Sequence, residues 1–137
     1  MFENCKNTKA QGNIGIAYAI AHYVSSGYTV SIPMNDSQEY DLVVDIDGFL
    51  NKVQVKTTGS KTPYGIYTVT LRNCGGTNGS VYGRVNSSSV DLVFILTASG
   101  DMYEVPLIDL QNNTNSLNLG DKALKYKITK PPALPVC

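Results

Sequence analysis

The sequence predicts an α/β protein in which one helix covers a mixed β-sheet, and two segments carry most of that prediction. Residues 40–58 alternate between apolar and polar side chains on both sides of Asp47-Gly48, a dipeptide typical of a two-residue hairpin turn. Residues 7–26 place apolar side chains at helical spacing. With 137 residues the chain can bury a sizeable core, and we expect one domain over residues 1–137.

The composition limits the kinds of protein to which the chain can belong. Eleven basic and eleven acidic residues give a formal net charge of zero, which argues against a nonspecific polyanion binder but allows a basic patch on one face. Three widely spaced cysteines, Cys5, Cys74 and Cys137, suit free thiols in a reducing compartment. The first residues lack the features of a signal peptide, and no apolar segment is long enough to span a bilayer. We therefore expect a cytoplasmic protein that is not in a membrane.

The predicted helix has recognisable ends. Asn7 or Thr8 can cap its start, and Gly27 can end it in a left-handed conformation. Its apolar side chains form two stripes, so we expect it to be largely buried across the sheet. Gly12 and Gly15 lower the helix propensity, which indicates close approach by a strand or a second subunit.

The predicted hairpin sets a register. If its turn has two residues, the numbers of paired residues sum to 95. Leu42 then lies opposite Val53, and Asp41 lies opposite Gln54, with Lys56 diagonally within reach of Asp41. A longer turn would shift this register.

A carboxylate, an amide and an ammonium on one sheet face have two interpretations. The first is a solvated face, which fits Lys52 and Asp45 well and is favoured by the pattern alone. The second is a metal-dependent phosphodiester site. In that site Asp41 binds Mg²⁺, the Gln54 side chain and the Val55 carbonyl add oxygen ligands, and Lys56 places positive charge beside the water or the phosphate.

The rest of the chain supplies further strands, a polar segment and a Pro-rich tail. Residues 73–89 are rich in Gly, Asn and Ser, and they suit either a flexible surface loop or a DNA-contacting segment. Residues 129–137 form a Pro-rich tail. Strands are predicted at residues 28–32, 64–71, 90–97 and 102–105, of which 90–97 is apolar enough to be central.

Asp41, twelve intervening residues and then Gln54-Val55-Lys56 resemble the core motif of PD-(D/E)XK nucleases, with Gln at the (D/E) position. The flanking segments strengthen the resemblance. NTKAQGNIGIAYAIAHYVSSGYTVSIP before the motif and VDLVFILTASGDMYEVPLIDL after it resemble intron-associated homing endonucleases of cyanobacteria and their phages, which carry this QxK variant. The similarity covers about residues 7–126.

The resemblance implies a restriction-endonuclease-like fold and a site-specific, Mg²⁺-dependent endonuclease acting on double-stranded DNA. It assigns catalysis to Asp41, Gln54 and Lys56, and metal binding to Asp41 and Val55. It also implies a homo-oligomer, a dimer or a tetramer, because cutting both strands needs two active sites. The candidate DNA contacts lie in the segments that follow the motif and are Lys61, Arg72, Tyr82 and Arg84.

Ile16 departs from the family pattern, which usually has Glu at this position as a further acid for the metal. Glu39 and Asp45 are alternative acids, although a solvated position is the simpler interpretation of Glu39. Loss of the acid at Ile16 implies an enzyme of reduced activity, or a DNA-binding protein on a nuclease fold that does not cut. A structure-selective nuclease resembling Holliday-junction resolvases is a further alternative.

Overall fold

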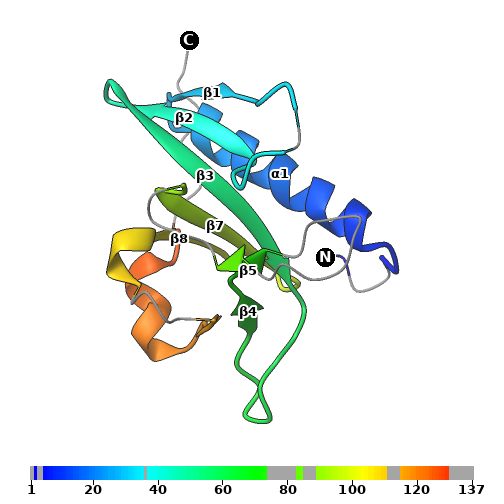
Figure 1. Ribbon diagram of the computed structural model, residues 1–137. Coiled ribbons are helices and arrows are strands. Elements are labelled where there is room, and N and C mark those ends of the chain that lie inside the picture. The colour runs from blue at the N-terminus through cyan, green and yellow to red at the C-terminus, as the bar shows by residue number, and fades with distance from the viewer. Residues whose placement is uncertain are drawn as a thin grey trace.

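The computed structural model of the protein describes residues 2, 5–35, 37–73, 83–84, 89–110 and 115–129, with backbone alone at 72–73 and 83–84. Its centre is a five-stranded sheet of order β1-β2-β3-β7-β8 (Figure 1). Only β3 and β7 pair in parallel, so the sheet is mixed, as predicted. The strands are β1 (Thr29–Ser31), β2 (Leu42–Ile46), β3 (Phe49–Thr58), β7 (Leu92–Thr97) and β8 (Met102–Pro106).

The hairpin of β2 and β3 has the predicted turn and register. Asp47 and Gly48 both take positive φ angles, of 53° and 88°, as a type I′ turn requires. The carboxylate of Asp45 accepts a hydrogen bond from the Gly48 N–H at 2.9 Å, which fastens the turn. Leu42 pairs with Val53, so the predicted sum of 95 is confirmed within the hairpin.

Helix α1 (Thr8–Ser25) lies against one face of the sheet (Figure 1). Asn7 caps it, because the Asn7 side chain accepts a hydrogen bond from the Lys9 N–H at 2.9 Å, and Gly27 follows its end with a φ of 86°. The prediction of a largely buried helix is wrong. Its buried residues form a single stripe of Gly15, Ala19 and Tyr23, whereas the apolar residues Ala17, Ala21 and Val24 are exposed.

Gly15 explains how closely this helix approaches β3. A side-chain carbon at Gly15 would lie 2.6 Å from the Thr57 methyl group and 3.1 Å from a Val55 methyl group. At Gly12 a side-chain carbon would meet nothing within 4 Å. Close approach is therefore confirmed at Gly15 alone, and it fixes α1 against the half of β3 that carries the predicted motif.

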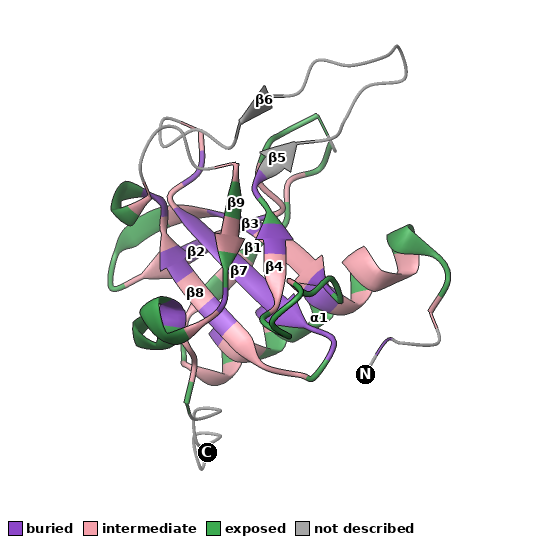
Figure 2. Cartoon of the chain, turned by 90° about the horizontal axis from the view of Figure 1, so that it is seen from below, coloured by how far each residue is buried: buried purple, intermediate pink, exposed green. Residues whose placement is uncertain are grey.

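Two apolar clusters lie on the two faces of the sheet, and β7 contributes to both. Figure 2 shows the buried residues concentrated in the strands of the sheet. Phe94 and Leu96 pack under α1, whereas Val93 and Ile95 face the opposite cluster. Every residue of β7 is buried, as predicted for a central strand.

The segment after β3 differs from the prediction. The predicted strand at residues 64–71 is reduced to β4 (Thr68–Thr70), which pairs with β9 (Ser116–Asn118) outside the main sheet. Two 3₁₀ helices follow β8, and no helix in the described ranges is long and apolar enough to cross a membrane. The remaining elements are β5 (Arg72–Asn73), β6 (Gly83–Arg84), η1 (Leu107–Asp109) and η2 (Asp121–Tyr126).

Candidate active site

Asp41 lies directly before β2, where the hairpin ladder ends. Its backbone N–H donates to the Val53 carbonyl at 2.9 Å. Its carboxylate accepts the Val55 N–H at 2.7 Å. In a continuing antiparallel ladder a β2 carbonyl would accept that N–H, so the side chain of Asp41 has taken the place of a backbone group. This bond holds the carboxylate at the edge of β3.

The ladder ends one residue earlier than the sequence-based register implies. The last pair is Leu42 with Val53, and the backbone of Asp41 binds Val53. The predicted direct pairing of Asp41 with Gln54 is therefore not part of the strand ladder. The departure matters chemically because it frees the edge of β3 beyond Val53 from β2 and leaves the Asp41 carboxylate beside it.

Val55 contributes a second oxygen on this edge. The N–H and the carbonyl of one strand residue point to the same neighbouring strand. Because the Val55 N–H points to Asp41, the Val55 carbonyl points to the same edge of β3. A carboxylate and a carbonyl on one edge are oxygen ligands of the kind that hard divalent cations prefer.

The environment of Asp41 alters its acidity. Burial raises the pKa of the Asp41 carboxyl above its ordinary value, while the Val55 N–H and the positive charge of Lys56 act in the opposite direction. The structure thus brings Lys56 within electrostatic reach of Asp41. A cation at this position would favour the ionised carboxylate still further.

Gln54 and Lys56 share the sheet face opposite to α1. Val55 and Thr57 face the helix at Gly15, and successive side chains of a strand alternate between faces. Gln54 is buried, with 8% of its surface exposed, and Lys56 is half-buried. Their partners across the parallel pairing are residues of the apolar β7, so neither lies on the solvated face that the pattern alone favoured.

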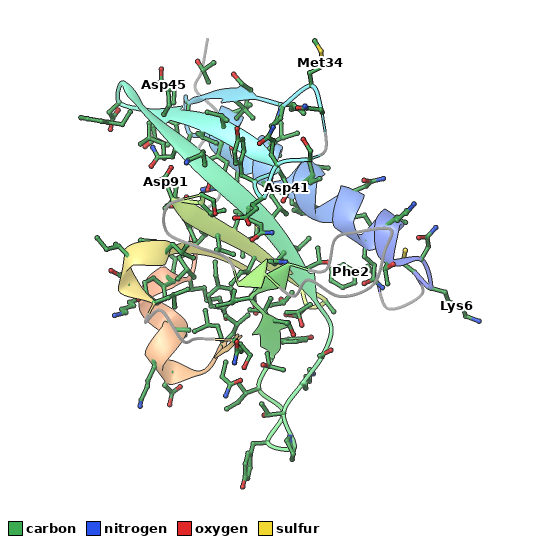
Figure 3. The ribbon with its side chains drawn as sticks, in the orientation of Figure 1. Phe2, Lys6, Met34, Asp41, Asp45 and Asp91 are labelled. Atoms are coloured by element: carbon green, nitrogen blue, oxygen red, sulfur yellow. The ribbon has the colours of Figure 1, made fainter. Side chains whose placement is uncertain are left out.

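The candidate acids other than Asp41 have structural roles. Glu39 is exposed and accepts a hydrogen bond from the Ser89 hydroxyl. Asp45 binds the hairpin turn, and Figure 3 shows it at the opposite end of β2 from Asp41. Ile16 packs against the cluster under α1. Among the described residues there is no group of three or more His, Cys, Asp and Glu that could hold a metal ion.

A family model for PD-(D/E)XK endonucleases matches residues 6–130. The chain belongs to the PD-(D/E)XK endonuclease family. Among solved structures it is similar to a bacterial homing endonuclease, I-Ssp6803I, with a TM-score of 0.75 and 26% sequence identity over 88% of each chain. No curated protein matches the chain. The predicted family and fold are therefore confirmed, and the protein is a DNA endonuclease of this family.

A second aspartate of the endonuclease, which the sequence analysis missed, binds the backbone of β3. Asp91 precedes β7, and its carboxylate accepts the Lys52 N–H at 2.8 Å while its own N–H donates to the Lys52 carbonyl at 2.8 Å. Figure 3 shows Asp41 and Asp91 on opposite sides of β3. The sequence held a signal, because Asp-Leu-Val occurs both at residues 41–43 and at residues 91–93.

The four predicted DNA contacts of the endonuclease are described by the structure to different extents. Lys61 is exposed, and its ammonium lies 4.7 Å from the centre of the Tyr67 ring. Arg72 in β5 and Arg84 in β6 are backbone partners in a two-stranded antiparallel ribbon. Tyr82 lies outside the described residues. Within the segment predicted as a loop, residues 73 and 83–84 lie in paired strands.

Proposed function

We propose that this endonuclease is a site-specific, Mg²⁺-dependent enzyme of the homing type, which hydrolyses phosphodiester bonds in duplex DNA. The observation that carries the proposal is the carboxylate of Asp41, held on the Val55 N–H at the edge of β3 with Lys56 in electrostatic reach. The likeness to a bacterial homing endonuclease over 88% of both chains supports the homing type.

The oxygen atoms at this edge fit a magnesium ion. Asp41 and the Val55 carbonyl would hold it, with the neighbouring Gln54 amide completing or orienting the ligands. When bound, Mg²⁺ supplies Lewis-acid polarisation of the scissile phosphate. Because Asp41 is the one acid that we assign to the site, the residues of the chain alone bind the ion weakly. DNA phosphate oxygens then become necessary ligands.

Lys56 acts on the reacting phosphate. Its ammonium already lowers the pKa of the partly buried Asp41, and in this proposal it also acts on a phosphate bound beside that carboxylate. A fixed positive charge in a half-buried position stabilises negative charge that develops in the transition state. Lys56 also orients the attacking water by hydrogen bonding.

Lys61, Arg72, Tyr82 and Arg84 contact the DNA in this proposal. The pairing of Arg72 with Arg84 supports it, because a two-stranded ribbon fits the major groove of B-DNA and arginine binds guanine edges or phosphates. Cutting both strands requires two copies of the site, so the working form is a dimer or a tetramer. Light scattering of the purified protein measures this subunit number.

The test begins with a pool of plasmids that carry randomised inserts, because the target site is a property to be selected. We expect wild type to linearise a subset of the pool in Mg²⁺ and to leave all of it intact in EDTA. Lys56→Ala should abolish the cleavage. The exposed Lys125 is the matched control, and Lys125→Ala should cut as wild type does. Equal cutting by Lys56→Ala would remove Lys56 from the mechanism.

Ile16 favours a second candidate function, a DNA-binding protein that does not cut. Its side chain packs with the apolar cluster under α1, where the family resemblance leads one to expect Glu. This candidate requires binding of duplex DNA in EDTA, with log K falling linearly with log salt, and no nicking after long incubation in Mg²⁺. Cleavage by wild type rules it out.

A further inference from the structure

A rigid hairpin continues β3 beyond the sheet and leads into β4 (Figure 1). Its two arms are paired from the base to the tip. Thr68 N–H donates to the Ser60 carbonyl at 3.0 Å, and Lys61 pairs with Tyr67. Near the tip, Thr62 N–H donates to the Ile66 carbonyl at 2.8 Å.

The base of this hairpin is braced against the body of the protein. Leu119 N–H donates to the Tyr67 carbonyl at 2.8 Å. Ile66 lies beside Gly120, where an added side-chain carbon would be 3.5 Å from Ile66. The Thr58 hydroxyl donates to the Thr68 carbonyl, across the point where β3 and β4 separate. The hairpin is thus held at a fixed angle to β3.

Tyr64 stands at the tip with 90% of its surface exposed. The turn that carries it is closed by a hydrogen bond from the Gly65 N–H to the Thr62 carbonyl at 2.9 Å, and Gly65 takes a φ of 80°. Pro63 restricts the preceding position. A large aromatic side chain on a stiff turn loses little conformational entropy on binding, and this favours a role in contact with a partner.

Charge is strongly segregated along the chain in this region. Residues 48–90 contain five Lys or Arg and no Asp or Glu, whereas the rest of the sequence contains the other six basic residues and all eleven acidic ones. The formal charge is therefore +5 within this segment and −5 outside it. The segment includes both Lys56 beside Asp41 and Lys61 in the hairpin, so positive charge extends from the active site into the hairpin.

We propose that the hairpin at residues 58–68 is a second DNA-contacting element, in which Tyr64 packs against the sugars and bases of the duplex and Lys61 binds a phosphate. The inference rests on the proposed function. Ten residues of extended chain from Gln54 to Tyr64 span at most about 33 Å at roughly 3.3 Å per residue. At 3.4 Å per base pair the contact falls within about ten base pairs of the scissile phosphate.

The tip suits DNA better than a second protein chain. A stable protein interface buries about 800 Å² on each partner, which one tyrosine at a turn cannot supply. A DNA contact needs no such area, because it adds to a footprint that already includes the active site. The positive charge of this region includes the Lys61 ammonium in the first arm of the hairpin, and it is complementary to the negative charge of the DNA phosphates.

The chain contains no tryptophan, so a single Tyr64→Trp substitution gives a specific fluorescent reporter. With a 40-base-pair duplex of random sequence, we expect its emission to be quenched as DNA saturates the protein. Met34→Trp is the control, because Met34 is fully exposed and lies at the end of the molecule away from this hairpin (Figures 1 and 3). Quenching at position 64 without quenching at position 34 supports the proposal.

Binding measurements give an independent test. Tyr64→Ala should weaken binding to the same duplex about tenfold. Lys61→Ala should reduce the salt slope by about 0.9, the value for one lost phosphate contact. Lys125→Ala is the matched control, because Lys125 is also exposed and lies 4.9 Å from a tyrosine ring.

The outcomes separate the two proposals. If wild type cuts DNA but Tyr64→Trp is not quenched and both alanine variants bind normally, the hairpin inference is overturned and the proposed function stands. If Tyr64→Ala changes the subunit number while its DNA binding is normal, the hairpin is a protein interface and the inference is again overturned. If wild type binds no duplex, both proposals fall.

Discussion

The segments Asp41–Val43 and Asp91–Val93 have the same sequence and both flank β3, but they have different roles. Each begins with an aspartate whose carboxylate accepts a backbone N–H of β3. Asp91 makes two hydrogen bonds to a single residue, because its N–H donates to the Lys52 carbonyl and its carboxylate accepts the Lys52 N–H. Asp41 bridges two residues, Val53 and Val55.

The direction of the attached strand explains the difference. Asp91 precedes β7, which continues along β3 in parallel for its whole length. Asp41 precedes β2, which runs in the opposite direction and pairs with β3 only as far as Val53. The edge of β3 beyond Asp41 is therefore left without β2, and that is the edge to which the Val55 carbonyl points. One motif thus yields a brace on one side of β3 and a candidate active site on the other.

The largest expected effect is on DNA cleavage, and it distinguishes Asp41 from Asp91. Asp41→Asn keeps an oxygen that can accept the Val55 N–H but removes the negative charge, so we expect cleavage to fall at least about 100-fold. Asp91→Asn should retain cleavage within about twofold, because Asp91 is placed on the other side of β3. Initial rates of plasmid cleavage in Mg²⁺ measure both. Similar losses in the two variants would contradict this division of roles.

The second effect concerns the side of β3 that α1 covers. Gly15→Ala would place a carbon 2.6 Å from the Thr57 methyl group, so the helix must move, at a cost of about 1–3 kcal/mol in the free energy of unfolding. Gly12→Ala is the matched control in the same helix, with nothing within 4 Å, and should stabilise by up to about 1 kcal/mol. Urea unfolding followed by circular dichroism compares them. Destabilisation by Gly12→Ala would show that helix propensity does not decide its effect.

The third effect tests Asp91 as a brace. Asp91→Ala leaves the Lys52 N–H without its carboxylate acceptor, which should lower the free energy of unfolding by about 1–2 kcal/mol. Cleavage measured well below the melting temperature should be close to that of wild type. Thermal unfolding and cleavage assays on one preparation report both properties. A stable variant that fails to cut would place Asp91 in the active site.

The comparison also shows how far the sequence determines the site. The type I′ turn follows from Asp47-Gly48, because local chemistry decides it, and this turn fixes the pair Leu42–Val53. The exchange of a backbone acceptor for the Asp41 side chain could not be predicted, because it depends on where β2 leaves the sheet. Asp91 was missed although its motif repeats that of Asp41.

Other errors arise from partners that are distant in sequence. The predicted strand at residues 64–71 was too long, because the paired part, β4, depends on β9 almost fifty residues later and its first residue instead forms a turn. The burial of α1 was overestimated, because an apolar stripe does not reveal whether a second layer covers it. Val24, for example, is 53% exposed. In both cases tertiary context outweighed the local pattern.

The smallest effect follows from the acidity of Asp41. Burial is the largest influence and raises the pKa of this carboxyl, against the effects of the Val55 N–H and Lys56. Between its ordinary and its raised pKa the folded protein holds a proton that the unfolded chain has released. Stability should therefore fall as pH rises through this window, and remain lower above it.

Asp41→Asn abolishes this ionisation, so in EDTA its free energy of unfolding should exceed that of wild type by an amount that grows as pH rises from the ordinary to the raised pKa of Asp41. At lower pH the two proteins should be equally stable. Lys56→Ala removes the charge that lowers the pKa of Asp41, so its window should extend to higher pH than that of wild type. Urea unfolding at a series of pH values measures all three proteins. Parallel pH profiles for wild type and Asp41→Asn would mean that the Asp41 carboxylate is solvated. The site would then lack the partly buried charge that distinguishes Asp41 from an ordinary surface acid.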